Sequence, residues 1–149
     1  MAEQQLLIFR AGRRLCALPA AQVAETLRPL PVEALPQTPD YILGVSMLRG
    51  EPTPMVDLGA LLTGDRLASP QRVVSLKTGP RRVGLLVSDV VGVRSTAALG
   101  NARLPTLIEH CAPEVVQQLA KLDDALLTVL KLGSVIPDDV WKAVAKGAA

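Results

Sequence analysis

The feature that most constrains this chain is an internal repeat. Residues 6–14 align with residues 73–81 at an offset of 67, and residues 56–62 align with residues 130–136 at an offset of 74. The change of offset indicates a short insertion in the second half. A duplicated unit of short strands with glycine turns predicts two small β-barrels packed against each other.

The 149 residues form a single domain of ordinary size, with approximate subdomains at residues 5–69 and 70–141. Aliphatic side chains must build the core, because hydrophobic residues make up 49% of the chain but aromatic residues only 2%. A half of this length buries too little apolar surface to be stable alone. The repeat therefore predicts a strongly apolar interface between the halves.

Local patterns predict mostly short strands. Residues 6–10 and 15–18 form a β-hairpin around a turn at residues 11–14. Residues 20–27 fit either a helical turn or a strand whose charged face carries Glu25. The other expected elements are strands at residues 41–48, 55–58, 83–93 and 125–132, helical segments at 60–67 and 114–121, a loop at 101–106, and a C-terminal helix from Pro137 through Val144.

A charged corner, Arg49-Gly50, separates two of these strands. Glycine permits positive φ or a close backbone approach there. Pro52 and Pro54 follow, and since proline has no N–H to donate to a ladder, the corner should lie at the edge or end of a sheet. Asp57 is placed to cap the helical turn that comes next.

The residues around this corner resemble the CheW family of bacterial chemotaxis coupling proteins. Residues 39–45, 48–51 and 54–58 are similar in order and spacing to the family signature P-x-Y-I-x-G-V-x-N-L-R-G-x-x-x-P-V-V-D-L. Residues 83–93 resemble a second family element, V-G-L-x-V-D-x-V-x-x-V. The resemblance implies a mainly β fold of two five-stranded, SH3-like β-barrels with short helices, in which terminal strands can cross between the barrels.

The resemblance also implies a non-catalytic adaptor that couples chemoreceptors, the methyl-accepting chemotaxis proteins, to a CheA-type histidine kinase. In the family, the groove between subdomains binds the helical tip of the chemoreceptor, and the barrel ends pair with the regulatory domain of the kinase. A second interpretation keeps the fold but changes the pathway to pilus motility or second-messenger control. Two departures from the family favour it: Met47 replaces the usual asparagine, and Lys131 replaces the usual Asp or Asn.

Partners of small barrels commonly bind strand edges and apolar grooves. The valines among the candidate residues favour the core over the surface by about two to one, and the glycines serve turns. Arg49 and Glu25 are hardest to assign to a core role, and the resemblance implies that Arg49 is a charged anchor. The partner-binding candidates are Val23, Glu25, Gly44, Val45, Arg49, Gly50, Val87, Asp89 and Val93, of which Val23, Glu25, Gly44 and Arg49 match the contact motifs of the family.

Charge and spacing argue against other classes of function. The formal net charge is only +2, with 16 basic and 14 acidic residues, which gives no electrostatic case for nucleic acid. The carboxylates show no metal-ligand spacing and the glycines form no phosphate-binding loop, so we expect neither metal nor cofactor. No run is long enough to span a bilayer and no signal peptide is visible, so we expect a cytoplasmic protein without direct membrane insertion.

A small enzyme or ligand-binding β protein is the alternative from another class. It would use His110, the single histidine, and the adjacent Cys111. Neighbouring side chains on an extended backbone point in different directions, and a nucleophilic pair also needs an orienting group. We therefore expect no catalytic residue.

Overall fold

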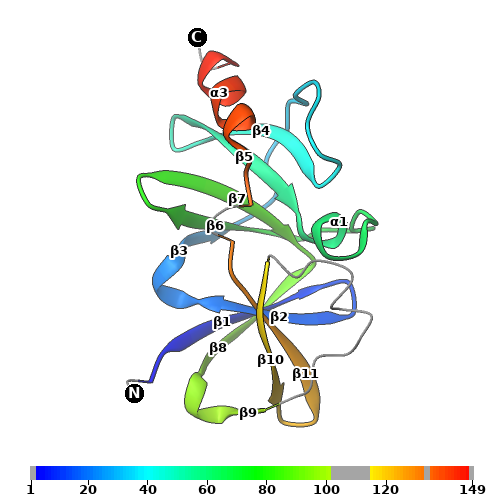
Figure 1. The fold of residues 1–149 in the computed structure, drawn as a ribbon, viewed down its shortest axis with the longest axis vertical. Helices are drawn as coiled ribbons and strands as arrows, with labels where there is room; N and C mark the ends of the chain where they lie inside the picture. Colours follow the sequence, from blue (N-terminus) through cyan, green and yellow to red (C-terminus); the bar gives the residue numbers. More distant parts are fainter. Residues whose placement is uncertain (1–2, 102–114, 133–134, 148–149) are drawn as a thin grey trace.

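The computed structural model describes residues 3–101, 115–132 and 135–147, which form two β-sheets and few helices (Figure 1). In spatial order, sheet A contains β8 (Asp89–Ser95), β1 (Gln5–Ala11), β2 (Arg14–Pro19), β11 (Ala125–Leu130), β10 (Val116–Leu122) and β9 (Leu99–Asn101). Sheet B contains β3 (Val23–Leu27), β6 (Arg72–Thr78), β7 (Arg81–Val87), β5 (Glu51–Asp57) and β4 (Ile42–Leu48). The prediction of a mainly β chain is confirmed, although the short strand β9 gives sheet A six strands rather than five.

The sheets do not follow the sequence boundary near residue 70. Sheet A combines the N-terminal β1–β2 hairpin with β8 to β11, and sheet B combines the β6–β7 hairpin with β3 to β5. In Figure 1 the blue N-terminal strands accordingly lie with the yellow and orange strands from the end of the chain. Each copy of the repeat gives its hairpin to one sheet and its remaining strands to the other.

The strand registers follow the same repeat. Ala17 pairs with Val129 in sheet A, and Gly84 pairs with Met55 in sheet B, at positions related by the two offsets. The register shift in the β1–β8 ladder and the one in the β3–β6 ladder also fall at equivalent places. The two sheets are therefore built on one plan, down to their bulges.

A shared apolar core joins the sheets. Phe9 and Leu18 contribute to it from sheet A, and Val74, Leu85 and Val87 contribute from sheet B. Each sheet also encloses a smaller cluster of its own. The apolar interface predicted from the size of the halves is present, and it holds together two sheets that interleave both copies.

Two of the three predicted helical segments are present, although the first covers residues 58–63 rather than the expected 60–67. The Asp57 side chain accepts a hydrogen bond from the Ala60 N–H at 3.0 Å and caps α1 (Leu58–Thr63). Helix α3 (Asp138–Gly147) has two aspartates in its first turn, which favours a helix N-terminus. Its Val140 and Val144 side chains are buried in the shared core.

The helix expected at residues 114–121 is wrong where the structure describes it, because β10 occupies residues 116–122. This stretch contains helix-forming residues, but pairing with β11 and β9 overrides that local preference. At residues 20–27 both alternatives hold in part, since the 3₁₀ turn η1 (Ala20–Gln22) leads into β3. A second 3₁₀ turn, η2 (Thr96–Ala98), precedes β9, and most of the loop expected at residues 101–106 lies outside the described residues.

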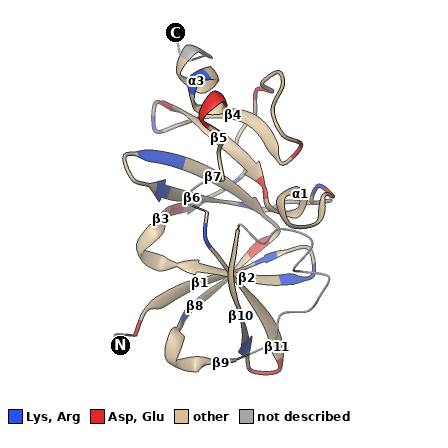
Figure 2. Cartoon of the chain, viewed as in Figure 1, with Lys and Arg blue, Asp and Glu red and all other residues tan. Residues whose placement is uncertain are grey.

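Charged residues of both signs occur in both sheets (Figure 2). Among the helices in the described part of the chain, none combines the length and the apolar character needed to cross a bilayer.

Candidate partner-binding surface

An ion pair joins the two outer strands of sheet B. Glu25 lies on β3 and Arg49 directly follows β4, and these strands stand at opposite ends of the hydrogen-bonding order of the sheet. Arg49 Nε donates to Glu25 Oε2 at 3.0 Å, and Arg49 Nη2 donates to Oε1 at 3.1 Å. Because this bidentate contact spans the two edges, it closes the curve of the sheet.

The β4–β5 turn places the arginine. Leu48 pairs with Glu51, so Arg49 and Gly50 alone form the turn. Their φ angles are 54° and 79°, and positive φ at both central residues is what a type I′ hairpin turn requires. A left-handed conformation costs a non-glycine residue about 1–2 kcal/mol. The hairpin and the contact with Glu25 therefore hold Arg49 in a conformation that it would seldom adopt in a free loop.

The prolines after the turn lie where the sheet tolerates them. Pro52 and Pro54 face Met47 and Val45 of β4, whereas the parallel ladder between β5 and β7 begins only at Met55. Neither proline therefore removes a donor from the β5–β7 ladder. The corner lies at the end of a ladder, as the sequence predicts.

The ion pair remains open to solvent. The Arg49 side chain is 70% exposed and the Glu25 side chain 26% exposed. The hydrogen bond from Arg49 lowers the pKa of Glu25, and the same bond to Glu25 raises the pKa of Arg49. Both groups are therefore charged near neutral pH, and the exposed part of the guanidinium can donate to an acceptor on a partner.

Gly44 has a structural role beneath the neighbouring backbone. Glu33 and Val45 exchange two backbone hydrogen bonds of 2.8 Å, which lay the segment after β3 along the outer edge of β4. Gly44 is buried there with a φ of 144°, and an added Cβ would overlap the Glu33 carbonyl. The structure corrects the prediction that Gly44 lies on a partner-binding surface. The backbone at Glu33 covers Gly44 and leaves no room for a side chain.

The candidate valines divide between core and edge. Val23 and Val45 are half-buried and pack against the shared core. Val87 has no exposed surface, since its side chain lies inside that core. Its assignment to a partner surface is thus corrected: it faces inward from β7.

Asp89 and Val93 lie apart from the ion pair, on sheet A. Both belong to β8, an outer strand that pairs with β1. Asp89 is exposed, and Val93 is 53% exposed. They form a second exposed edge rather than part of the Glu25–Arg49 site.

Among the described residues, the sequence prediction missed four exposed large apolar side chains, those of Val32, Met47, Val91 and Leu126. Met47 is 62% exposed beside the Arg49 turn, and Val91 is 52% exposed on β8. Met47 carried two signals: it takes an outward position in the alternation of β4, and it departs from the family pattern. With Arg49, it gives the end of the β4–β5 hairpin both an apolar and a cationic group.

The described residues contain no cluster of three or more His, Cys, Asp or Glu side chains that could hold a metal ion. His110 and Cys111, the residues of the enzyme alternative, lie outside the described residues. Cys16 lies in the core, where burial raises its pKa to about 12. Its thiol is therefore protonated at neutral pH and is a poor nucleophile.

Comparison with known proteins places this geometry in a family. The CheW-like domain family matches residues 5–140. Protein FrzA of Myxococcus xanthus is 35% identical over 106 residues, which cover 69% of this chain but only 61% of FrzA. The chemotaxis protein CheW of Rhizobium meliloti is 26% identical over 143 residues, which cover 94% of this chain and 92% of that protein.

Solved structures show the same fold. The crystal structure of the scaffolding protein TtCheW from Thermoanaerobacter tengcongensis superposes with a TM-score of 0.76 at 22% identity, covering 90% of this chain and 92% of that one. The family match extends over nearly the whole chain and includes the turn that carries Arg49 and both sheets. The chain therefore belongs to the CheW-like domain family.

Proposed function

We propose that this chain is a non-catalytic adaptor in chemotaxis-type signalling, which couples chemoreceptors to a CheA-type histidine kinase. The observation that carries the proposal is the fixed, exposed Arg49–Glu25 pair at the end of sheet B in a CheW-like domain. A preorganised arginine loses little conformational entropy on binding and gives a partner a directional donor. The relatives named CheW and the scaffold TtCheW support the assignment.

The proposed kinase-facing surface is the end of the β4–β5 hairpin. It carries Arg49 with Gly50, the exposed Met47 and the neighbouring strand β3 with Glu25. An apolar group next to a fixed charge resembles the anchors that dominate protein interfaces. The proposed receptor-facing surface lies at the strand edges that carry Val23 and Val93. Binding of a chemoreceptor tip to this surface would hold the protein at a membrane-associated receptor array.

The test is a pull-down of the purified regulatory domain of a CheA-type kinase. Arg49→Glu places two carboxylates side by side, so we expect at least a tenfold loss of affinity. The charge-exchanged double variant, Glu25→Arg with Arg49→Glu, restores the pair within the protein but reverses the outward charge. If Arg49 only supports the fold, the double variant will bind like the wild type; if Arg49 contacts the kinase, the double variant will stay weak.

Arg28→Glu is the matched control, because Arg28 is an exposed arginine just after β3. It should bind like the wild type, and circular dichroism should show all variants folded. The adaptor proposal would be refuted if the wild-type chain bound neither a kinase regulatory domain nor a chemoreceptor tip.

The second candidate function keeps the adaptor role in a pilus-motility or second-messenger pathway. It is favoured by Met47, which is exposed on the proposed surface where the family usually has a polar asparagine. Met47→Asn should raise the affinity for a flagellar-type kinase domain if this residue sets partner choice. Unchanged affinities for kinase domains of both pathways would remove the support that Met47 gives to this candidate.

A further inference from the structure

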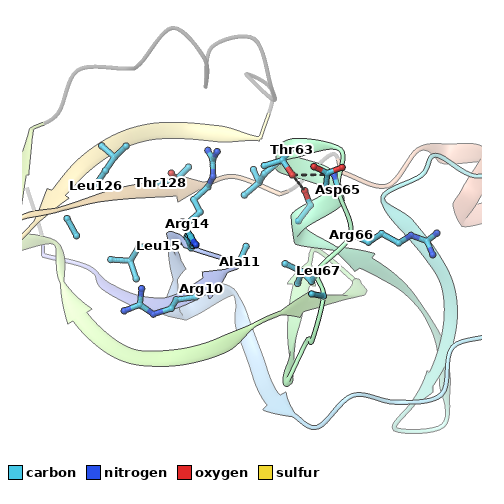
Figure 3. Close-up of a pocket in the computed structure, with 16 residues that line it drawn as sticks. Arg10, Ala11, Arg14, Leu15, Thr63, Asp65, Arg66, Leu67, Leu126 and Thr128 are labelled. Carbon is cyan, nitrogen blue, oxygen red and sulfur yellow. Dashed lines mark hydrogen bonds between the residues drawn. The ribbon is translucent and has the colours of Figure 1, made fainter.

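A cavity of about 680 Å³ lies between sheet A and the segment formed by α1 and the loop after it, on a part of the molecule that the proposed adaptor function does not use. One wall comes from the β1–β2 hairpin and β11, and the other comes from α1 and the loop after it (Figure 3). Its volume falls in the range of small-molecule sites, about 300–1,000 Å³. We propose that this cavity binds a small organic oxyanion, a phosphate or carboxylate compound with an apolar portion.

Cationic side chains dominate the cavity wall. Arg10, Arg13 and Arg14 line it from the hairpin, and Asp65 is the acidic residue among the lining residues that the structure describes. The ion pairs within the described residues join Arg49 to Glu25 and Arg94 to Asp123, so none of them neutralises the hairpin arginines. A fourth lining arginine, Arg66, extends away from the hairpin side in Figure 3. The positive charge therefore gathers on the hairpin wall, where an oxyanion would accept hydrogen bonds from guanidinium groups.

A buried hydroxyl provides a second, independent indication. Thr128 of β11 lines the cavity beside Arg14, is only 1% exposed, and its Oγ1 has no hydrogen-bond partner. An unsatisfied buried hydroxyl costs free energy unless something in the cavity pairs with it. Because Oγ1 has less than 1 Å² of accessible surface, the Thr128 side chain must rotate about χ1 toward the cavity to donate a hydrogen bond to a bound oxyanion.

Both walls are fixed in place. The Gly12 N–H donates to Ser88 Oγ at 2.7 Å, and the Ser88 N–H donates to the Arg10 carbonyl at 2.8 Å, which ties the hairpin to the start of β8. On the opposite wall, the Leu67 N–H donates to the Asp57 carboxylate at 3.2 Å. The apolar side chains of Leu62, Leu67 and Leu126 also line the cavity and would contact the apolar portion of the ligand. The site is thus largely preformed, as small-molecule sites usually are.

The test is an NMR titration of the full chain with phenyl phosphate, phthalate and the neutral benzyl alcohol. The amide signals of Gly12 and Gly59, on the two walls, should shift saturably with a dianion and not with benzyl alcohol. Saturation by phenyl phosphate alone would identify a phosphate site, and saturation by both dianions would identify a general oxyanion site. The proposal would be overturned if neither dianion gave saturable shifts, or if benzyl alcohol bound as tightly as the dianions.

Variants separate specific binding from surface charge. Arg14→Gln should raise the dissociation constant about tenfold and Thr128→Val about threefold. Thr128→Val keeps the side-chain shape and removes an unpaired hydroxyl, so it should fold. If Arg14→Gln does not fold, Arg13→Gln takes its place in the test. Arg28→Gln, an arginine outside the cavity, should bind like the wild type. The cavity proposal would be contradicted if the arginine variant (Arg14→Gln or Arg13→Gln) and the Thr128→Val variant each bound the dianion with wild-type affinity. This outcome does not depend on the result of the kinase pull-down.

Discussion

The two copies of the repeat close their sheets with opposite charges. In sheet B, Arg49 of the β4–β5 turn meets Glu25 of the outer strand β3. In sheet A, Asp123 of the equivalent β10–β11 turn meets Arg94 of the outer strand β8. The two turn residues have almost the same positive φ, 54° and 55°. The backbone position is therefore kept between the copies while the charge is reversed.

The two ion pairs differ in quality. The sheet A contact is a single one of 3.8 Å between side chains that are 45% and 80% exposed, and such pairs contribute little to stability. The sheet B contact has two short hydrogen bonds that fix the guanidinium plane. Sheet A shows that this fold does not require a bidentate contact at this turn. The fixed geometry in sheet B is available to the partner that we propose for Arg49.

The largest expected difference between the copies concerns Gly44, whose repeat equivalent is the exposed Gln118. Gly44→Ala should lower the free energy of unfolding by about 3 kcal/mol, because its Cβ meets the Glu33 backbone and its φ is unfavourable. Urea denaturation measures the change. Gln118→Ala is the matched control and should stay within about 0.5 kcal/mol of the wild type. Equal stability of Gly44→Ala and the wild type would mean that the segment after β3 does not press on β4.

A smaller effect is expected where the two parallel ladders pack. Gly84 opposes Met55 in sheet B, where sheet A pairs Ala17 with Val129. Gly84→Ala should cost about 2 kcal/mol, because the new Cβ overlaps the Met55 sulfur. Adding Met55→Val recreates the sheet A pair and should recover about 1 kcal/mol, although Met55→Val alone costs about 1 kcal/mol through the cavity it leaves.

A double-mutant cycle from urea denaturation tests this exchange of volume between neighbours. Strictly additive effects of Gly84→Ala and Met55→Val would show that the two positions do not compensate each other. The repeat would then preserve the strand register without preserving the packing.

Local patterns predicted much of this fold, because hairpins and caps depend on nearby residues. The turn at Arg49-Gly50 and the cap at Asp57 are examples. Local patterns could not assign each hairpin to a sheet, since the two hairpins have similar apolar patterns and pairing is non-local; only the family resemblance implied that terminal strands can cross. Strand β10 was missed for the same reason: its ladder partners lie elsewhere in the chain.

The candidate site was predicted in its charges but not in its geometry. Arg49 and Glu25 are polar residues without a core role, so their sequence context suffices to mark them. Their contact depends on the curvature of sheet B, which no local pattern specifies. Val87 and Val93 look alike in sequence, yet one is buried and the other is 53% exposed. The strand β7 that carries Val87 lies between two others in sheet B and faces the shared core, whereas the strand β8 that carries Val93 is an outer strand of sheet A.

The smallest expected effect is the pH dependence of the sheet B ion pair. Arg49 lowers the pKa of Glu25 below its unfolded value of about 4.3, so the folded state binds the proton less readily than the unfolded state. The stabilisation is fully present above about pH 4–5 and is lost as the pH falls through the lowered pKa. Glu25→Gln should thus be less stable than the wild type at pH 7, and the two stabilities should converge in acid.

Thermal unfolding at a series of pH values from neutral to acidic measures that convergence. Arg49→Gln is the matched variant, because it removes the partner and leaves the carboxyl. It should give the same convergence, and adding Glu25→Gln to it should change the pH profile little. A constant difference between Glu25→Gln and the wild type at every pH would mean that the carboxylate charge does not stabilise the closed sheet. The bidentate contact would then orient the Arg49 side chain for binding, and the charge of Glu25 would not contribute to the stability of the fold.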